Sequence, residues 1–133
     1  MPAQKFNILV VDDSPILVER ICDILSELEC ITFVGTATNF TDATNSLSKH
    51  AYDVVILDIN LPGKNGIELL SFVKSIYPRI KIIMLSNQSD SYYRNLCHSL
   101  GSDSFIDKTS EFEKIHSTIS GYFAEHQISN QVV

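Results

Sequence analysis

Short apolar runs that each end on a residue suited to phosphate or metal chemistry are the most constraining feature of this 133-residue chain. The runs cover residues 6–11, 54–57, 82–85 and 104–106. The residues that close them are, in chain order, Asp12 with Asp13, Asp58, Ser86 and Lys108. If the runs are neighbouring parallel strands, these side chains meet at the C-terminal edge of one sheet, where open α/β folds place their sites.

Strand-like and helix-like segments alternate five times along the chain. The expected strands span 6–11, 32–37, 53–58, 82–85 and 104–106. The expected helices begin after Ser14, near 40, near 67, near 93, and at a capping box of Ser110 and Glu113. This alternation predicts an α/β fold in a single domain: a doubly wound parallel sheet with helices on both faces. The domain is expected to span 1–133, with a core at about 6–126 and a fraying tail at 127–133.

Composition excludes several classes of protein. The formal net charge of −6 argues against non-specific binding of nucleic acid and of anionic membranes. Neither a secretory signal nor a membrane-spanning stretch is visible. The three cysteines are odd in number and match no zinc pattern, which favours a reducing cytoplasm.

The adjacent carboxylates of Asp12 and Asp13 suggest a cation site. Like charges ~4 Å apart repel by about 4 kcal/mol at an effective dielectric near 20. Mg²⁺ relieves such repulsion and prefers one or two carboxylates, water and phosphate. Each residue alone also has a simpler interpretation. One aspartate of the pair could cap a helix while the other is solvated, Ser86 could be a turn residue, and Lys108 could be a surface lysine. Together, the acid pair, Asp58, Ser86 and Lys108 each close an apolar run in this order, and this combination favours one joint site.

Four segments carry a resemblance to a known family: VVDDSP, VILDINLPGKNG, MLS and FIDK. With these, the chain resembles the receiver domain of bacterial two-component response regulators, the chemotaxis-regulator-like superfamily, from residue 6 to about 126. The resemblance implies a flavodoxin-like fold with five strands in the order 2-1-3-4-5 and five helices.

The resemblance also implies a role for each residue of the expected site. Asp58 is the implied phosphoacceptor. Mg²⁺ is the implied cofactor, held directly by Asp13, through water by Asp12, and by Asp58 and the backbone carbonyl of Asn60. The residues implied to sense the phosphoryl group are Lys108, which pairs with one oxygen, Ser86, which bonds another, and Phe105, which rotates in response.

Two residues depart from the family pattern, and a third, Ser86, is a mild variant of the threonine that the family commonly carries as its switch hydroxyl. Thr109 stands where a proline usually follows the site lysine. Because cis peptide bonds are costly without proline, the resemblance does not carry over the cis bond that is usual there. Asn87 stands where a small residue usually follows the switch hydroxyl, and its side chain is expected to restrict access to Asp58.

The function expected from these features is that of a phosphorylation-activated receiver. It accepts a phosphoryl group from a histidine kinase or phosphotransfer protein and switches a face that binds a downstream protein or output domain. It acts on no metabolite and catalyses only its own phosphorylation and dephosphorylation. A phosphate-independent binding module is the alternative, and an aspartate-nucleophile phosphatase is disfavoured because position 60 is not acidic. A standalone receiver is expected, without direct nucleic-acid or membrane contact, and a phosphorylation-dependent dimer is an arrangement that the resemblance allows.

Overall fold

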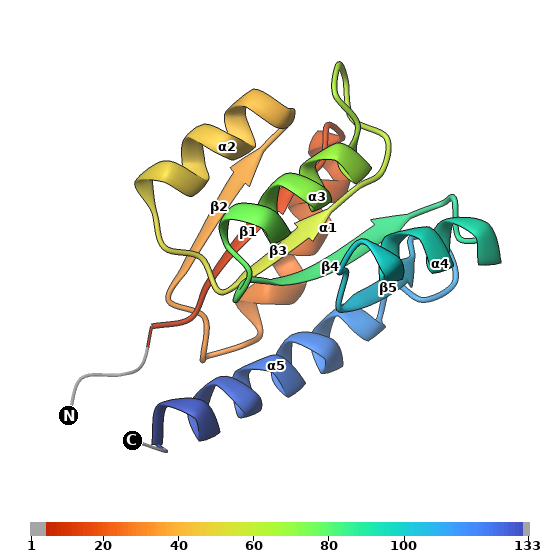
Figure 1. Ribbon diagram of the computed structural model, residues 1–133. Helices are drawn as coiled ribbons and strands as arrows, with labels where there is room; N and C mark the ends of the chain where they lie inside the picture. The colour runs from red at the N-terminus through yellow and green to blue at the C-terminus, as the bar shows by residue number, and fades with distance from the viewer. Residues whose placement is uncertain (1–4, 132–133) are drawn as a thin grey trace.

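The computed structural model describes residues 5–131. Strands and helices alternate throughout, as the sequence predicts (Figure 1). The elements are β1 (Asn7–Val11), α1 (Pro15–Ser26), β2 (Phe33–Ala37), α2 (Phe40–Lys49), β3 (Val54–Leu57), α3 (Gly66–Ile76), β4 (Lys81–Ser86), α4 (Ser91–Ser99), β5 (Ser104–Asp107) and α5 (Lys114–Gln131).

All five strands form one parallel sheet in the order β2-β1-β3-β4-β5, which confirms the predicted topology. Val11 pairs with Leu57, and Leu57 pairs with Met84, so the three central strands end side by side. Ser86 pairs with Asp107 at the end of β5. This register brings the residues that follow β1, β3 and β5 to one edge of the sheet.

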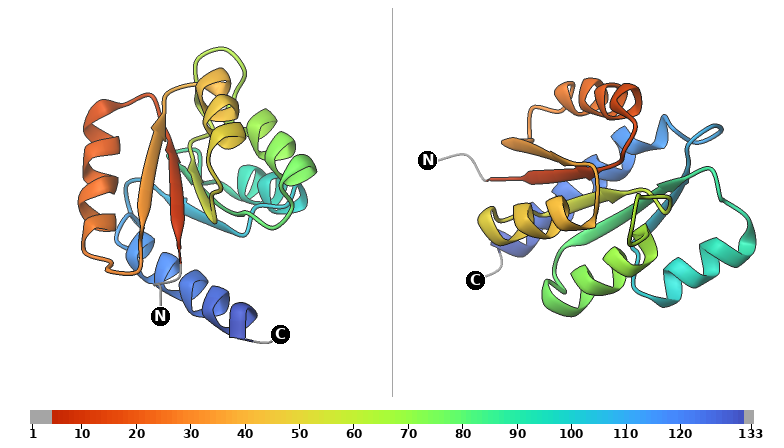
Figure 2. Two further views of the ribbon diagram at one scale, coloured as in Figure 1. Left: turned by 90° about the vertical axis from the view of Figure 1, so that its left-hand side faces the viewer. Right: turned by 90° about the horizontal axis from the view of Figure 1, so that it is seen from above.

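Helices cover both faces of the sheet, with α1 and α5 on one side and α2, α3 and α4 on the other (Figure 2). Alternate residues of the central strands supply the two cores because successive side chains in a strand point to opposite faces. Ile8, Val10 and Ile56 pack toward α1 and α5. Leu9 and Val55 pack toward the other three helices. The central strands are thus buried on both faces, as their continuous apolar runs predict.

Helix starts follow local sequence signals. The Ser14 side chain accepts a hydrogen bond from the backbone of Leu17, and Pro15 takes the first helical position, both as predicted. The polar helix α2 begins in the same way at Asn39, and its buried Ala43 and Leu47 attach it to the sheet. Among residues 5–131, no helix is long and apolar enough to cross a bilayer.

The start of the last helix differs from the prediction. The Ser110–Glu113 capping box does not form, and α5 begins only at Lys114. The cause is a competing acceptor, because the Asp107 carboxylate takes hydrogen bonds from the backbone N–H groups of Thr109 and Ser110. These bonds fold the segment after β5 into turns.

The end of the last helix also differs. A tail without regular structure was expected at 127–133, whereas α5 continues past His126 to Gln131, and residues 132 and 133 lie outside the described part. The extension lacks an apolar stripe, and Ile128 is exposed. It contains neither glycine nor proline, so nothing in its sequence terminates the helix.

Candidate functional site

Three carboxylates lie together where β1 and β3 end. Asp12, Asp13 and Asp58 each place one oxygen so that all three lie within 4.8 Å of one another. Asp12 and Asp58 are buried, at 2% and 4% exposure, whereas Asp13 is exposed. The backbone explains the contact, because the N–H of Asp58 donates to the carbonyl of Val11 and locks the two strand ends together.

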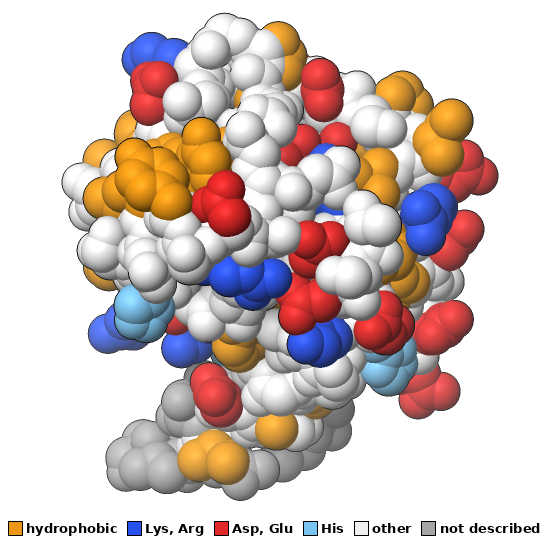
Figure 3. Space-filling view, turned by 90° about the vertical axis from the view of Figure 1, so that its right-hand side faces the viewer, with side chains coloured by type: hydrophobic (Ala, Val, Ile, Leu, Met, Phe, Trp, Pro, Cys, Tyr) orange, Lys and Arg blue, Asp and Glu red, His pale blue; other side chains and the backbone are white. Residues whose placement is uncertain are grey.

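Lys108 reaches this acidic group from the end of β5. Its Nζ lies 2.8 Å from Asp58 Oδ2 and 2.9 Å from Asp12 Oδ2. The lysine is positioned by the backbone, since its N–H donates to the carbonyl of Ser86. The structure therefore brings together four of the predicted site residues. Viewed toward this edge of the sheet, Asp and Glu side chains gather near the middle of the face with basic groups between them (Figure 3).

Burial and ion pairing act in opposite directions on the site. Burial raises the pKa of Asp58, and the hydrogen bond and charge of Lys108 only partly oppose that rise. For Lys108, burial alone would lower the pKa, but the hydrogen bond to Asp58 and the negative charges of Asp58 and Asp12 outweigh burial, so the pKa is raised. Lys108 is therefore protonated at neutral pH. One ammonium faces three carboxyl groups, so the site favours an additional cation.

The acidic group has a carboxylate oxygen that accepts no hydrogen bond, and this oxygen is suited to bind Mg²⁺. Asp12 Oδ2 is fully buried and makes no hydrogen bond of acceptable geometry, although Lys108 Nζ lies nearby. That contact is an ion pair without a directional hydrogen bond, and it leaves lone pairs available. Hard divalent cations take oxygen ligands of this kind, usually with water in the remaining positions.

Asn60 and Ser86 border the acidic group in different ways. The backbone N–H of Asn60 donates to Asp58 Oδ1 at 3.2 Å, which holds the loop after β3 against the carboxylate. Ser86 is buried at the end of β4, and its Oγ accepts a hydrogen bond from the backbone N–H of Gln88 at 3.1 Å. The Ser86 hydroxyl is thus engaged within its own loop.

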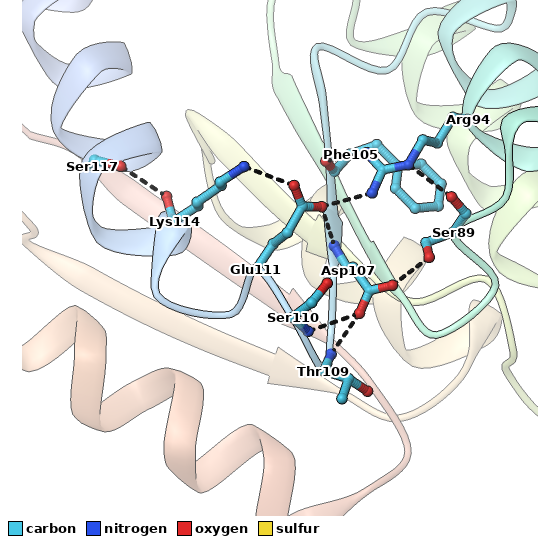
Figure 4. Close-up of polar contacts among 9 residues, drawn as sticks. All are labelled: Ser89, Arg94, Phe105, Asp107, Thr109, Ser110, Glu111, Lys114 and Ser117. Atoms are coloured by element: carbon cyan, nitrogen blue, oxygen red, sulfur yellow. Dashed lines mark hydrogen bonds and ion pairs between the residues drawn. The ribbon is translucent and has the colours of Figure 1, made fainter.

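Phe105 lies in β5, half-buried against the core formed with α2, α3 and α4. The Arg94 guanidinium of α4 stacks over its ring, 4.9 Å from the centroid. The close-up shows this stacking among a group of polar contacts that joins α4 to the end of β5 (Figure 4). The family resemblance indicated Phe105, whereas no sequence pattern pointed to Arg94, Asp107 or Glu111, whose contacts join segments distant along the chain.

The two residues that depart from the family pattern contact each other. Thr109 Oγ1 donates to Asn87 Oδ1 at 3.0 Å, which links the loop after β4 to the loop after β5. No cis peptide bond occurs in the described range, so the bond between Lys108 and Thr109 is trans.

Removing one carboxylate is expected to stabilise the metal-free protein. Asp13→Asn relieves repulsion within the acidic group, and we expect the free energy of unfolding without metal to rise by about 1 kcal/mol. The same change should weaken Mg²⁺ binding at least tenfold, because even outer-sphere partners of a metal typically contribute about 10–100-fold. Thermal melts and Mg²⁺ titration measure the two effects.

Asp23→Asn is the matched control, since it removes the same charge from an exposed position on α1 outside the acidic group. The control should leave Mg²⁺ affinity unchanged. A metal-free Asp13→Asn protein that melts below the wild type would contradict the repulsion.

An open parallel sheet in this order, with carboxylates and a lysine at its C-terminal edge, defines a class of α/β proteins that bind their ligands at that edge. Within this class, the family model "Response regulator receiver domain" matches residues 8–120. The chain belongs to the response regulator receiver family, as its sequence motifs predict.

Individual relatives support this assignment. The chain is 41% identical over 107 residues to a protein-glutamate methylesterase/protein-glutamine glutaminase of Clostridium acetobutylicum, covering 79% of this chain and 31% of that protein. It is 30% identical over 122 residues to the transcriptional regulatory protein MalR of Bacillus subtilis, covering 92% and 52%. A structure titled as a CheX-CheY-BeF3-Mg complex from Borrelia burgdorferi matches with a TM-score of 0.81 and 28% identity, covering 89% of each chain. The chain spans 31% of the length of the first of these curated relatives and 52% of the second.

Proposed function

We propose that this chain is a phosphorylation-dependent switch in which Asp58 accepts a phosphoryl group in a Mg²⁺-dependent reaction. The observation that carries the proposal is the position of Lys108, whose ammonium contacts the buried carboxylates of Asp12 and Asp58 at once. A phosphoryl group on Asp58 would enter a site that already holds a cation for its oxygens and acidic ligands for a metal.

The proposed chemistry is nucleophilic attack by an Asp58 carboxylate oxygen on phosphorus. The new bond is an acyl phosphate, and the bond broken joins phosphorus to the donor, a histidine nitrogen in the case of a kinase. Asp12, Asp13, Asp58 and the backbone carbonyl of Asn60 would hold Mg²⁺, which supplies positive charge to the transferring oxygens when bound. Lys108 would move from the carboxylate to a phosphoryl oxygen and stabilise the same charge.

Ser86 and Phe105 are the proposed switch residues. Ser86 Oγ accepts from the Gln88 N–H, which leaves its O–H available. After transfer, that O–H would donate to a phosphoryl oxygen and form a charge-assisted hydrogen bond of the stronger kind. That bond exists only in the phosphorylated state, so it biases an equilibrium between two arrangements of the loop. The Phe105 ring would then turn and change the surface formed by α4, β5 and α5.

The proposed partners are a cytoplasmic histidine kinase or phosphotransfer protein and a downstream protein or output domain. The chain would act on these partners and on no metabolite. The curated relatives extend beyond the length of this chain, and one of them is named as a methylesterase. Whether such an output is attached in the same polypeptide or is a separate protein is answered by the length of the intact gene.

Phosphoryl uptake in the presence and absence of metal tests the proposal. Incubated with a small acyl phosphate donor and Mg²⁺, the protein is expected to gain the mass of one phosphoryl group, and excess chelator is expected to suppress the gain. Intact-mass spectrometry measures it. A protein that takes up no phosphoryl group under either condition would favour the alternative, a phosphate-independent binding module.

A further inference from the structure

We propose that Ser89, Arg94, Asp107 and Glu111 form a latch that stabilises the present arrangement of the switch region and thereby opposes phosphorylation. The inference rests on the proposed function and adds a regulatory element to it. Below, "the latch" means these four residues and their contacts (Figure 4).

Arg94 is the centre of the latch. Its Nε donates to the backbone carbonyl of Ser89 at 2.7 Å, and one terminal nitrogen donates to Glu111 Oε1 at 2.6 Å. The other terminal nitrogen donates to the backbone carbonyl of Phe105 at 3.3 Å. One side chain of α4 thus holds the loop before α4, strand β5 and the turn before α5. Arginine suits this role because its planar fork presents several donors in fixed directions.

Asp107 closes the latch at the end of β5. Its carboxylate accepts a hydrogen bond from the Ser89 hydroxyl, and its backbone N–H donates to Glu111 Oε1 at 3.0 Å. Glu111 Oε1 is therefore shared between Arg94 and the Asp107 backbone. Both acids keep their charge at neutral pH, because their hydrogen bonds lower the pKa of Asp107 to about 2 and that of Glu111 to about 2. The latch is expected to hold unchanged across the physiological pH range.

The latch restrains the segments that the proposed switch must move. Ser89 lies three residues after Ser86 in the loop between β4 and α4, and Asp107 directly precedes Lys108. A shift of Ser86 toward Asp58 would pull on a loop that Ser89 anchors to β5. The Phe105 ring also lies under the Arg94 guanidinium, so it cannot turn freely until Arg94 moves.

Thermodynamic linkage makes the latch measurable. Suppose that the latch stabilises the arrangement that binds a phosphoryl group less well. By linkage, the factor by which a bound phosphoryl group weakens the latch equals the factor by which breaking the latch increases affinity for that group. Beryllofluoride, a mimic of the acyl phosphate, permits an equilibrium measurement with Mg²⁺, whereas phosphorylation itself is limited by rate. The test therefore compares dissociation constants of beryllofluoride for the wild type and for latch variants of the full chain.

We expect Arg94→Met and Glu111→Gln to bind beryllofluoride about fivefold or more tightly than the wild type, at the lower end of typical coupling between sites. Methionine removes the guanidinium that stacks over Phe105 and keeps an unbranched side chain, and glutamine keeps the shape of the glutamate. Lys114→Met is the matched control. The Lys114 ammonium pairs with the other oxygen, Glu111 Oε2, at 2.7 Å, and its side chain is 57% exposed, so we expect a change of less than twofold.

The outcomes separate the latch from the function on which it rests. Unchanged or weaker affinity in both latch variants, with a wild type that binds beryllofluoride, overturns the latch and leaves the proposed function standing. A wild type that binds no beryllofluoride with Mg²⁺ overturns both. Circular dichroism melts identify a variant that fails to fold. Ser89→Ala, which removes one hydroxyl at the edge of the latch, then takes the place of that variant, and we expect it too to bind beryllofluoride more tightly than the wild type.

Discussion

Asp58→Asn is expected to abolish phosphoryl uptake, the largest effect of any single change in this chain. Asparagine keeps the shape of the side chain and an acceptor oxygen, but its amide is no nucleophile for phosphorus. Intact-mass measurement with a small phosphodonor and Mg²⁺ should show one added phosphoryl group in the wild type and none in the variant.

Asp53→Asn is the matched control for this experiment. Asp53 precedes β3 at the opposite edge of the sheet, and its Oδ2 accepts a hydrogen bond from the Asn7 backbone that an asparagine oxygen can still accept. The control should take up one phosphoryl group as the wild type does. Full uptake by Asp58→Asn would show that the acceptor is another residue and would refute the assignment.

The sequence predicted the fold and the composition of the site because both depend on short-range patterns. Continuous apolar runs between helical segments indicate buried parallel strands, and the carboxyl ends of such strands must share an edge. Asp12, Asp58 and Lys108 each follow a strand directly, so their convergence required only the correct strand order. The order itself came from the family resemblance and not from the apolar pattern.

The errors at the last helix have a local origin. Ser110 and Glu113 match a capping box, but the Asp107 carboxylate accepts the hydrogen bond from the Ser110 N–H that the Glu113 side chain would accept in such a box. Sequence patterns rank neither acceptor above the other. Beyond His126, the helix continues although Gln127 and Ile128 are exposed, and periodicity cannot detect a helical segment whose sequence has no apolar stripe.

The latch could not be predicted from the sequence. Arg94 and Glu111 are 17 residues apart and belong to different segments, and each alone resembles an ordinary surface charge. Their pairing depends on α4 lying beside β5, which is a property of the assembled fold. Capping and apolar periodicity act over a few residues, so neither provides a signal for contacts of this range.

Lys108→Ala is expected to uncouple phosphorylation from switching almost completely, whereas Ser86→Ala should only weaken the coupling. Moving a population from 1:99 to 99:1 requires about 5.5 kcal/mol of differential binding. A hydrogen bond from the Ser86 hydroxyl to a charged oxygen contributes about 1.5–3 kcal/mol, which is too little alone. The remainder must come from the buried ammonium of Lys108, which contacts Asp58 at 2.8 Å and has 15% of its side chain exposed.

Amide chemical shifts before and after beryllofluoride addition measure this coupling at Phe105 and its neighbours in α4 and β5. In the wild type these shifts should move together with those of the pocket. In Lys108→Ala they should stay near their starting values while the pocket still responds, and in Ser86→Ala they should move part of the way. Ser86→Thr keeps the hydroxyl, and its shifts around Phe105 should move as far as those of the wild type. Wild-type shifts confined to the pocket would refute the switch, because the bound group would then leave the surface around Phe105 unaltered.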